Sequence, residues 1–248
     1  MSKRFKGKVC VYCGIRPATT ADHIFARQFF LPHRRDNLPK VPACAECNGE
    51  KSRLEHNLTA VLPFGGSHGD SLAALSEMVP PRLAKNHTLR QRLTTQHSYV
   101  WDQSGNGPPI PAMTVPIDAD VLLALLGYLA KGLAWHHWQV VIGPAYFVDP
   151  LMLNAPGLQR FNALWGLQAK ARVGDMLGAG TFSYEGAQGV TDPGITVWRF
   201  TIFGGLRLAG DPRSPHEEVA LFGALTGPRA VAAAAEAALA GDADAMEI

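Results

Sequence analysis

Two pairs of cysteines constrain the fold of this chain more than any other feature of its sequence. Cys10 and Cys13 form one C-x2-C pair, Cys44 and Cys47 form another, and the chain contains no other cysteine. Four thiolates close a tetrahedral zinc site and leave no position open for water or substrate. We therefore expect one structural zinc ion, which joins two segments separated by thirty residues.

Disulfide bonds are the competing interpretation of these cysteines. A secreted disulfide scaffold would spread its cysteines along the chain and would begin with a signal peptide. The first residues, MSKRFKGKVC, are charged and contain no apolar core of that kind. Zinc is the better interpretation, and it predicts a cytoplasmic protein. The longest apolar run, VLLALLGYLA, is too short to span a bilayer, so no membrane association is expected.

Positive charge is concentrated in the first segment of the chain. Residues 1–53 carry eleven Lys or Arg and four Asp or Glu, which gives +7, whereas the whole chain of 248 residues carries +2. A segment that stays basic after binding a metal favours a polyanion as its partner. A merely solvated basic N-terminus is the alternative interpretation.

The expected organisation is an α+β fold in three parts. Residues 5–65 form a zinc module, residues 66–117 form a connecting segment, and residues 118–248 form a mixed α+β C-terminal domain of unknown role. The boundary falls in LPFGGSHGD, which lacks the Gly-Lys-Ser/Thr of a phosphate-binding loop and is expected to be a turn.

Apolar periodicity predicts the main elements. A helix follows the second cysteine pair, because apolar residues recur at helical spacing between residues 54 and 62. A second helix covers ADVLLALLGYLAKGLAWHHW, which is apolar on nearly every face. GTFSYEGA and GITVWRFTIFGGLRLAG alternate apolar with polar residues and predict a β-hairpin or meander. The tail, SPHEEVALFGALTGPRAVAAAAEAALA, predicts two short helices separated by a Gly-Pro break.

The first segment also carries the residue types that a single-metal phosphodiesterase needs. Asp22 and Asn48 supply oxygen ligands for Mg²⁺ or Mn²⁺, and His23 supplies a base that takes a proton from water. Adjacent strand residues point to opposite faces, so Asp22 and His23 reach one phosphate only where the backbone bends. Because Asn48 follows Cys47 directly, zinc binding fixes its position at a helix N-terminus that attracts anions. Lys51, one turn later, is placed to contact a phosphate.

The order of these residues resembles that of the zinc-containing HNH endonucleases. The matching pattern is C-x2-C, Asp-His, an Asn, and C-x2-C-Asn with a Lys three residues later, over residues 10 to about 60. The resemblance implies an N-terminal ββα-metal (treble-clef) zinc module, in an H-N-N variant of the family. It implies that Asp22 and Asn48 bind a catalytic Mg²⁺ or Mn²⁺ and that His23 is the general base. Asn37 matches the middle Asn, whose hydrogen bonds tie the loop together.

The predicted function is therefore metal-dependent hydrolysis of DNA phosphodiester bonds. Contacts to backbone phosphates are expected from Lys51, Arg27, Arg34, Arg35, Lys40 and Arg53. His33 is the candidate for a second, assisting histidine. RNA is the alternative substrate, because the ribose 2′-OH permits its cleavage, although no RNA-binding module is recognisable. The alternative function is a catalytically inactive zinc module that binds nucleic acid or a protein partner. Protein partners, oligomeric state and target site stay open.

Overall fold

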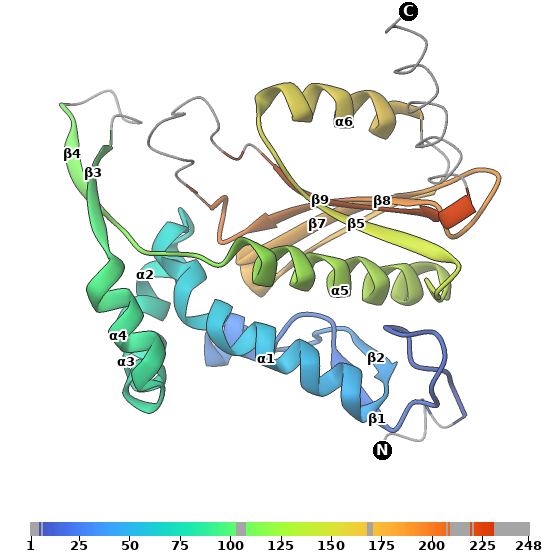
Figure 1. Ribbon diagram of the computed structural model, residues 1–248, viewed down its shortest axis with the longest axis horizontal. Helices are drawn as coiled ribbons and strands as arrows, with labels where there is room; N and C mark the ends of the chain where they lie inside the picture. The colour runs from blue at the N-terminus through green and yellow to red at the C-terminus, as the bar shows by residue number, and fades with distance from the viewer. Residues whose placement is uncertain are drawn as a thin grey trace, which may run out of the picture.

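The computed structural model describes residues 5, 7–102, 108–167, 171–206, 208, 219 and 221–230. Helices and strands both contribute, which confirms the mixed α+β class expected from the sequence. In Figure 1 helix α5 (Ala119–Trp138) lies between helix α1 (Ala45–Val61) and a five-stranded sheet, and α6 (Ala155–Leu167) covers the far face of that sheet. Within these ranges, no helix is both long enough and apolar enough to cross a membrane.

The first unit is a β-hairpin followed by a helix. β1 (Thr20–His23) pairs antiparallel with β2 (Lys40–Ala43), and α1 begins two residues after β2. Cys44 caps that helix, because its Sγ accepts a hydrogen bond from the N–H of Cys47. The helix predicted after the second cysteine pair is confirmed, and Asn48 lies in its first turn.

The chain from residue 62 to residue 96, which includes the first part of the connecting segment, is largely helical. Its elements are a 3-10 helix (Leu62–Gly65), α2 (Gly69–Ala73), a π-helical turn (Ala74–Met78), α3 (Val79–Lys85) and α4 (His87–Gln96). The sequence LPFGGSHGD, expected to be a turn, is the 3-10 helix followed by a short bend that leads into α2. The bend is tied to the C-terminal sheet, since the N–H groups of Ser67 and His68 both donate to the carbonyl oxygen of Phe203. A short helix predicted for residues 71–78 corresponds to the α2 and π-helical segment.

A separate hairpin follows α4 and was not predicted. β3 (Ser98–Asp102) and β4 (Ile110–Thr114) pair antiparallel and belong to no other sheet. Figure 1 shows this hairpin projecting from the body of the protein beyond the end of α4. We refer to β3 and β4 together as the arm.

The C-terminal region is a five-stranded antiparallel sheet in the order β5-β9-β8-β7-β6. Its strands are β5 (Tyr146–Leu153), β6 (Ala171–Leu177), β7 (Phe182–Gln188), β8 (Thr196–Ile202) and β9 (Leu221–Pro228). The predicted helix at ADVLLALLGYLAKGLAWHHW is α5, and the predicted meander is β7 and β8; both predictions are confirmed.

The prediction of a helix at the start of the tail is wrong. Residues 221–228 form β9, which lies between β5 and β8 in the interior of the sheet. A strand covered on both faces reads as a continuous apolar run and not as an alternating one, so its sequence is not distinguishable from that of a buried helix by periodicity. The second predicted tail helix, after the Gly-Pro break, falls on residues 229–240, of which only 229 and 230 are described, and these two are helical.

One hydrophobic core joins the first unit to the C-terminal sheet. The ring of Phe25, two residues after β1, lies 5.4 Å from the ring of Phe182 on β7. Tyr12, between the first two cysteines, packs against Tyr128 of α5 with ring centroids 4.9 Å apart. The zinc-module segment and the C-terminal region therefore pack directly on each other through α5.

Candidate functional site

The four cysteines meet at one point of the fold. Their Sγ atoms all lie within 4.8 Å of one another, and all four are free thiols. Cys10, Cys44 and Cys47 are buried, and Cys13 is partly exposed. Four sulfur atoms this close together suit a tetrahedral zinc ion. The cluster could therefore hold a metal such as zinc, as the cysteine spacing predicted.

Hydrogen bonds to sulfur organise this cluster. The N–H of Arg16 donates to Cys13 Sγ at 3.5 Å, and its guanidinium donates to Cys47 Sγ at 3.6 Å. Burial raises the pKa of Cys13, but hydrogen bonds from the N–H groups of Arg16 and Ile15 outweigh burial and lower that pKa to about 6. Donors of this kind stabilise the thiolate, which is the form that binds a metal.

Gly14 closes the turn that carries the first cysteine pair. Its N–H donates to the carbonyl oxygen of Cys10 at 2.8 Å, and its φ of +68° lies in the left-handed region. A Cβ at this position would lie 2.7 Å from the Cα of Gly143, in the loop after α5. Glycine is needed here for both backbone conformation and close packing.

Asn48 faces β1 from the first turn of α1. Its Nδ2 donates to Thr20 Oγ1 at 3.2 Å, and that hydroxyl donates to the carbonyl oxygen of Ala43 at 3.0 Å. Thr20 and Asp22 are alternate residues of β1, so their side chains share one face of the hairpin. Asn48 on the helix and Asp22 on the strand therefore contribute to the same surface.

A buried polar network surrounds the carboxylate of Asp22. The hydroxyl of Tyr12 donates to Asp22 Oδ2 at 2.6 Å, and Lys51 Nζ lies 3.1 Å from the same oxygen. Lys51 also donates to the carbonyl oxygen of His23 at 2.8 Å and forms an ion pair with Glu55. Burial, followed by the charge of Asp22, raises the pKa of Tyr12 well above its usual value, so the phenol remains a donor. Burial also raises the pKa of Glu55 to about 7, against the lowering effect of Lys51.

The position of Lys51 differs from its expected role as a phosphate contact. Its side chain is 0% exposed, and its ammonium is surrounded by Asp22, Glu55 and the His23 carbonyl. Lys51 does share a helix face with Asn48, as the spacing indicates, but that face is turned toward β1 and not toward solvent. We therefore assign Lys51 to holding the strand against the helix.

His23 ends β1 and lies opposite Lys40 of β2. Strand alternation directs its side chain to the face opposite that of Asp22. Neither ring nitrogen has a hydrogen-bond partner in the part of the chain that the structure describes. Burial lowers the pKa of His23 below its usual 6.5, and Lys40 and Arg27 lower it further, while Asp22 acts in the opposite direction. The imidazole is therefore neutral at pH 7, the form that a general base requires.

The basic residues expected at phosphates lie mainly at the surface, and Arg27 and Lys40 are the two of them near His23. Arg27, Arg34 and Lys40 are exposed, and Arg35 is partly exposed. The Nε of Arg35 donates to the carbonyl oxygen of Phe30 at 3.0 Å, which fixes this side chain. Burial, followed by the charge of Arg27, lowers the pKa of Arg35, so these two guanidinium groups are close enough to repel each other.

Arg82 of α3, in the connecting segment, lies near Arg35, which in turn lies near Arg27. We refer to these three residues as the arginine cluster. Its guanidinium donates to the carbonyl oxygens of Thr59 and Gln28, both at 2.5 Å. Burial, followed by the charge of Arg35, lowers its pKa. Among described residues, none of Arg27, Arg35 and Arg82 forms an ion pair with an acid. Uncompensated cations held together in this way favour an anionic ligand.

Asn37 has a backbone role in the turn before β2. It is exposed and has a left-handed φ of 56°, a conformation that Asn tolerates better than most residues. Its side chain makes no hydrogen bond with the described residues, so the loop hydrogen bonds implied by the resemblance are not seen there. His33 is exposed in the 3-10 helix Pro32–Arg34 and likewise lacks such a bond.

Sequence reasoning missed three residues of the site: Tyr12, Glu55 and Arg82. Glu55 follows Lys51 by four residues on α1, and this i,i+4 spacing of opposite charges was a signal that could have identified it. Tyr12 lies between the first two cysteines, so the cysteine cluster places it close to Asp22. Nothing in the sequence connects Arg82 to Gln28, which precedes it by 54 residues.

Comparisons with protein-family models, with curated proteins and with solved structures find no match to this chain.

Proposed function

We propose that this chain is an HNH-type endonuclease that hydrolyses DNA phosphodiester bonds. In this proposal the hairpin and α1 form a ββα-metal module in which the four cysteines hold a structural zinc ion. Asp22 and Asn48 are the ligands of one Mg²⁺ or Mn²⁺, and His23 is the general base. The observation that carries the proposal is the hydrogen bond from Asn48 to Thr20, because it sets Asn48 against the strand face that presents Asp22.

The donor atoms at this surface suit a hard cation. Asp22 Oδ2 is committed to Tyr12 and Lys51, and the amide nitrogen of Asn48 is committed to Thr20. Asp22 Oδ1 and Asn48 Oδ1 accept no hydrogen bond from the described residues, and carboxylate and amide oxygens are ligands that Mg²⁺ and Mn²⁺ prefer. When bound, the cation would neutralise charge on the scissile phosphate and leaving oxygen.

The protein groups around this surface have separate roles in the proposal. His23, neutral at pH 7, accepts a proton from the attacking water. Arg27 and Lys40 hold the phosphate backbone beside it and keep the imidazole deprotonated. Lys51 fixes the His23 carbonyl and the Asp22 carboxylate. Because Asp22 and His23 point to opposite faces of β1, the phosphodiester would bind past the end of the strand, the one place from which a single phosphate could reach both side chains.

A second candidate function is a zinc module that binds nucleic acid without cleaving it. The observation that favours it is the ion pair between Lys51 and Asp22, because a fixed ammonium already neutralises the carboxylate that a divalent cation would use. In this case the basic surface would give salt-dependent affinity, and the polar network would serve stability alone.

Plasmid nicking in Mg²⁺ or Mn²⁺ tests the proposal. His23→Ala should lower the nicking rate by about 100-fold or more, with unchanged zinc content, because general-base catalysis contributes about that much. His56→Ala removes an exposed histidine on α1 and should leave the rate unchanged. Equal rates for parent and His23→Ala would exclude His23 as the base. DNA binding by the parent without cleavage of plasmid, branched DNA, single-stranded DNA or RNA would establish the binding module instead.

A further inference from the structure

The arm carries an open aromatic face. Tyr99 and Trp101 are alternate residues of β3, and 68% and 69% of their surfaces are exposed. Met113 and Pro111 lie directly opposite them on β4 and are also exposed. Directly opposite residues and alternate residues share a face, so these four side chains form one apolar surface. A two-stranded sheet with such a face is marginally stable alone, which favours a ligand that covers it.

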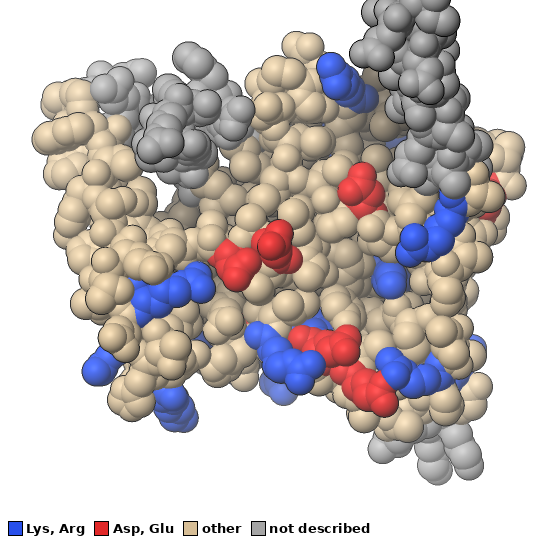
Figure 2. Space-filling view, viewed as in Figure 1, with Lys and Arg blue, Asp and Glu red and all other residues tan. Residues whose placement is uncertain are grey.

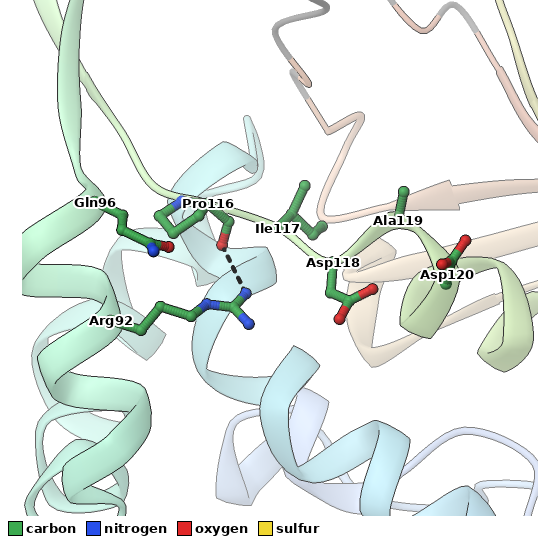
Figure 3. Close-up of a pocket in the computed structure, with 7 residues that line it drawn as sticks. All are labelled: Arg92, Gln96, Pro116, Ile117, Asp118, Ala119 and Asp120. Carbon is green, nitrogen blue, oxygen red and sulfur yellow. Dashed lines mark hydrogen bonds between the residues drawn. The ribbon is translucent and has the colours of Figure 1, made fainter.

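The base of the arm is firmly packed. Val115 and Ile117, just after β4, pack against buried leucines of α4 and the end of α1. Arg92 of α4 donates to the carbonyl oxygen of Pro116 at 3.4 Å. Figure 3 shows Arg92 reaching Pro116 beside a cleft of about 490 Å³ at the start of α5. The direction of the arm is therefore set at its base, while its aromatic face stays exposed.

Positive charge lies next to the arm. Residues 78–101 contain four Lys or Arg and no Asp or Glu. Of these four, Lys85 and Arg90 are exposed, and Arg82 belongs to the arginine cluster near His23. In Figure 2 blue side chains gather over α3 and α4, below an arm that shows no charge on this face. Basic side chains thus lie on α3 and α4 between the candidate site and the arm, and at the base of the arm Asp118 and Asp120 line the cleft together with Arg92.

We propose that the arm binds single-stranded nucleic acid, with bases stacked on Tyr99 and Trp101 and phosphates along Lys85 and Arg90. Alternate strand residues lie about 6.6 Å apart, which is about twice the 3.4 Å rise between stacked bases. Each ring can therefore take a base from a strand that is already unstacked. The ring of His97 lies 5.8 Å from that of Tyr99 at an interplanar angle of 82°, so it packs edge-on against Tyr99.

Stacking of this kind selects for structure and not for sequence, because every base has a π-face but only unpaired bases expose it. The arm would therefore favour a substrate that is single-stranded or locally opened. That this substrate is DNA rests on the proposed function. A second copy of the chain or another apolar protein surface would also cover the aromatic face. Such a partner would cover the aromatic face but would supply no negative charge to Lys85 and Arg90. A single-stranded nucleic acid would supply both the bases that cover the face and the phosphates that pair with the two cations.

Binding without added Mg²⁺ or Mn²⁺ tests this inference. Fluorescence anisotropy would compare a labelled oligothymidine of about 12 nucleotides with a duplex of the same length. Loss of two stacked bases should weaken oligothymidine binding by the double variant Tyr99→Ala, Trp101→Ala about 30-fold or more. Its duplex affinity should match that of the parent. Met176→Ala, which removes a side chain that is 66% exposed on β6, should change neither affinity.

Two outcomes would overturn the arm as a stacking site. One is oligothymidine binding by the double variant that equals binding by the parent. The other is a parent that sediments as a dimer and a double variant that sediments as a monomer, with equal oligothymidine affinities. That result would identify a second copy of the chain as the occupant of the aromatic face. His23→Ala should bind oligothymidine like the parent. Loss of the predicted nicking chemistry and loss of the arm's binding are therefore separately measurable.

Discussion

Lys51 Nζ lies 3.1 Å from Asp22 Oδ2, and the lysine side chain has no exposed surface. The same ammonium contacts the carboxylate of Glu55 and the carbonyl oxygen of His23. One buried cation therefore separates two carboxylates that would otherwise repel each other, and it binds the backbone next to the candidate base. The cysteine cluster positions the start of α1, and Lys51 joins the following turn of that helix to β1.

Removing the cation should destabilise the protein strongly. Lys51→Met leaves Asp22 and Glu55 buried without a counter-charge, and the expected loss of unfolding free energy is about 3–5 kcal/mol. Arg53→Met changes an exposed cation on the same helix and should alter stability by less than about 0.5 kcal/mol. Urea unfolding followed by circular dichroism gives both values. If the two variants are equally stable, the network does not hold the hairpin to α1.

Glu55 should make stability fall as pH rises. Burial raises its folded-state pKa to about 7, above its ordinary 4.5, so the folded chain holds the proton more tightly than the unfolded chain does. The stabilising contribution is complete below pH 4.5 and is lost as pH rises through about 7, with a slope of at most about 1.4 kcal/mol per pH unit.

The matched variant isolates this contribution. Glu55→Gln should remove that part of the slope between pH 5 and 7, whereas Glu77→Gln, at an exposed position, should retain it. Urea midpoints measured across this range provide the comparison. A parental slope in Glu55→Gln would assign the pH dependence to other groups.

The residues of the cysteine cluster were predictable from sequence because their spacing is a property of the chain itself. Helices α1 and α5 were predictable for the same reason, since their periodicity is local. The direction in which the Lys51 face of α1 points was not predictable, because it depends on the packing of α1 against β1. Arg82 reaches Gln28 only through the tertiary fold, and β9 is a strand only because β5 and β8 lie on either side of it. Local pattern determined which residues are present, and long-range packing determined what they contact.

Zinc should account for much of the stability of the first unit. Cys44→Ser removes one sulfur of the cluster but keeps an N-cap oxygen for α1, so bound zinc should fall from one ion per chain, and the unfolding free energy should fall by several kcal/mol through the loss of metal. Arg16→Gln, which removes the donor to Cys47 Sγ, should weaken zinc binding by about tenfold. Glu46→Gln alters the ion-pair partner of Arg16 without touching sulfur and serves as the control. Elemental analysis and chelator competition measure these effects; full zinc retention by Cys44→Ser would exclude a four-sulfur site.

Two glycines of α5 test how tightly the candidate site is docked on the C-terminal region. A Cβ at Gly132 would lie 3.1 Å from both Cγ1 and Cγ2 of Ile24, the residue after His23, whereas a Cβ at Gly127 would lie 3.6 Å from Cγ1 of Val148. Alanine in a helix interior is worth about 1 kcal/mol over glycine, so Gly127→Ala should raise unfolding free energy by roughly that amount. Gly132→Ala should raise the unfolding free energy by about 1 kcal/mol less than Gly127→Ala does, because Ile24 is fully buried and must shift. The imidazole NMR signals of His23 should move in Gly132→Ala and stay in place in Gly127→Ala. Equal stabilisation by both substitutions, with unmoved His23 signals, would show that α5 does not set the position of this strand.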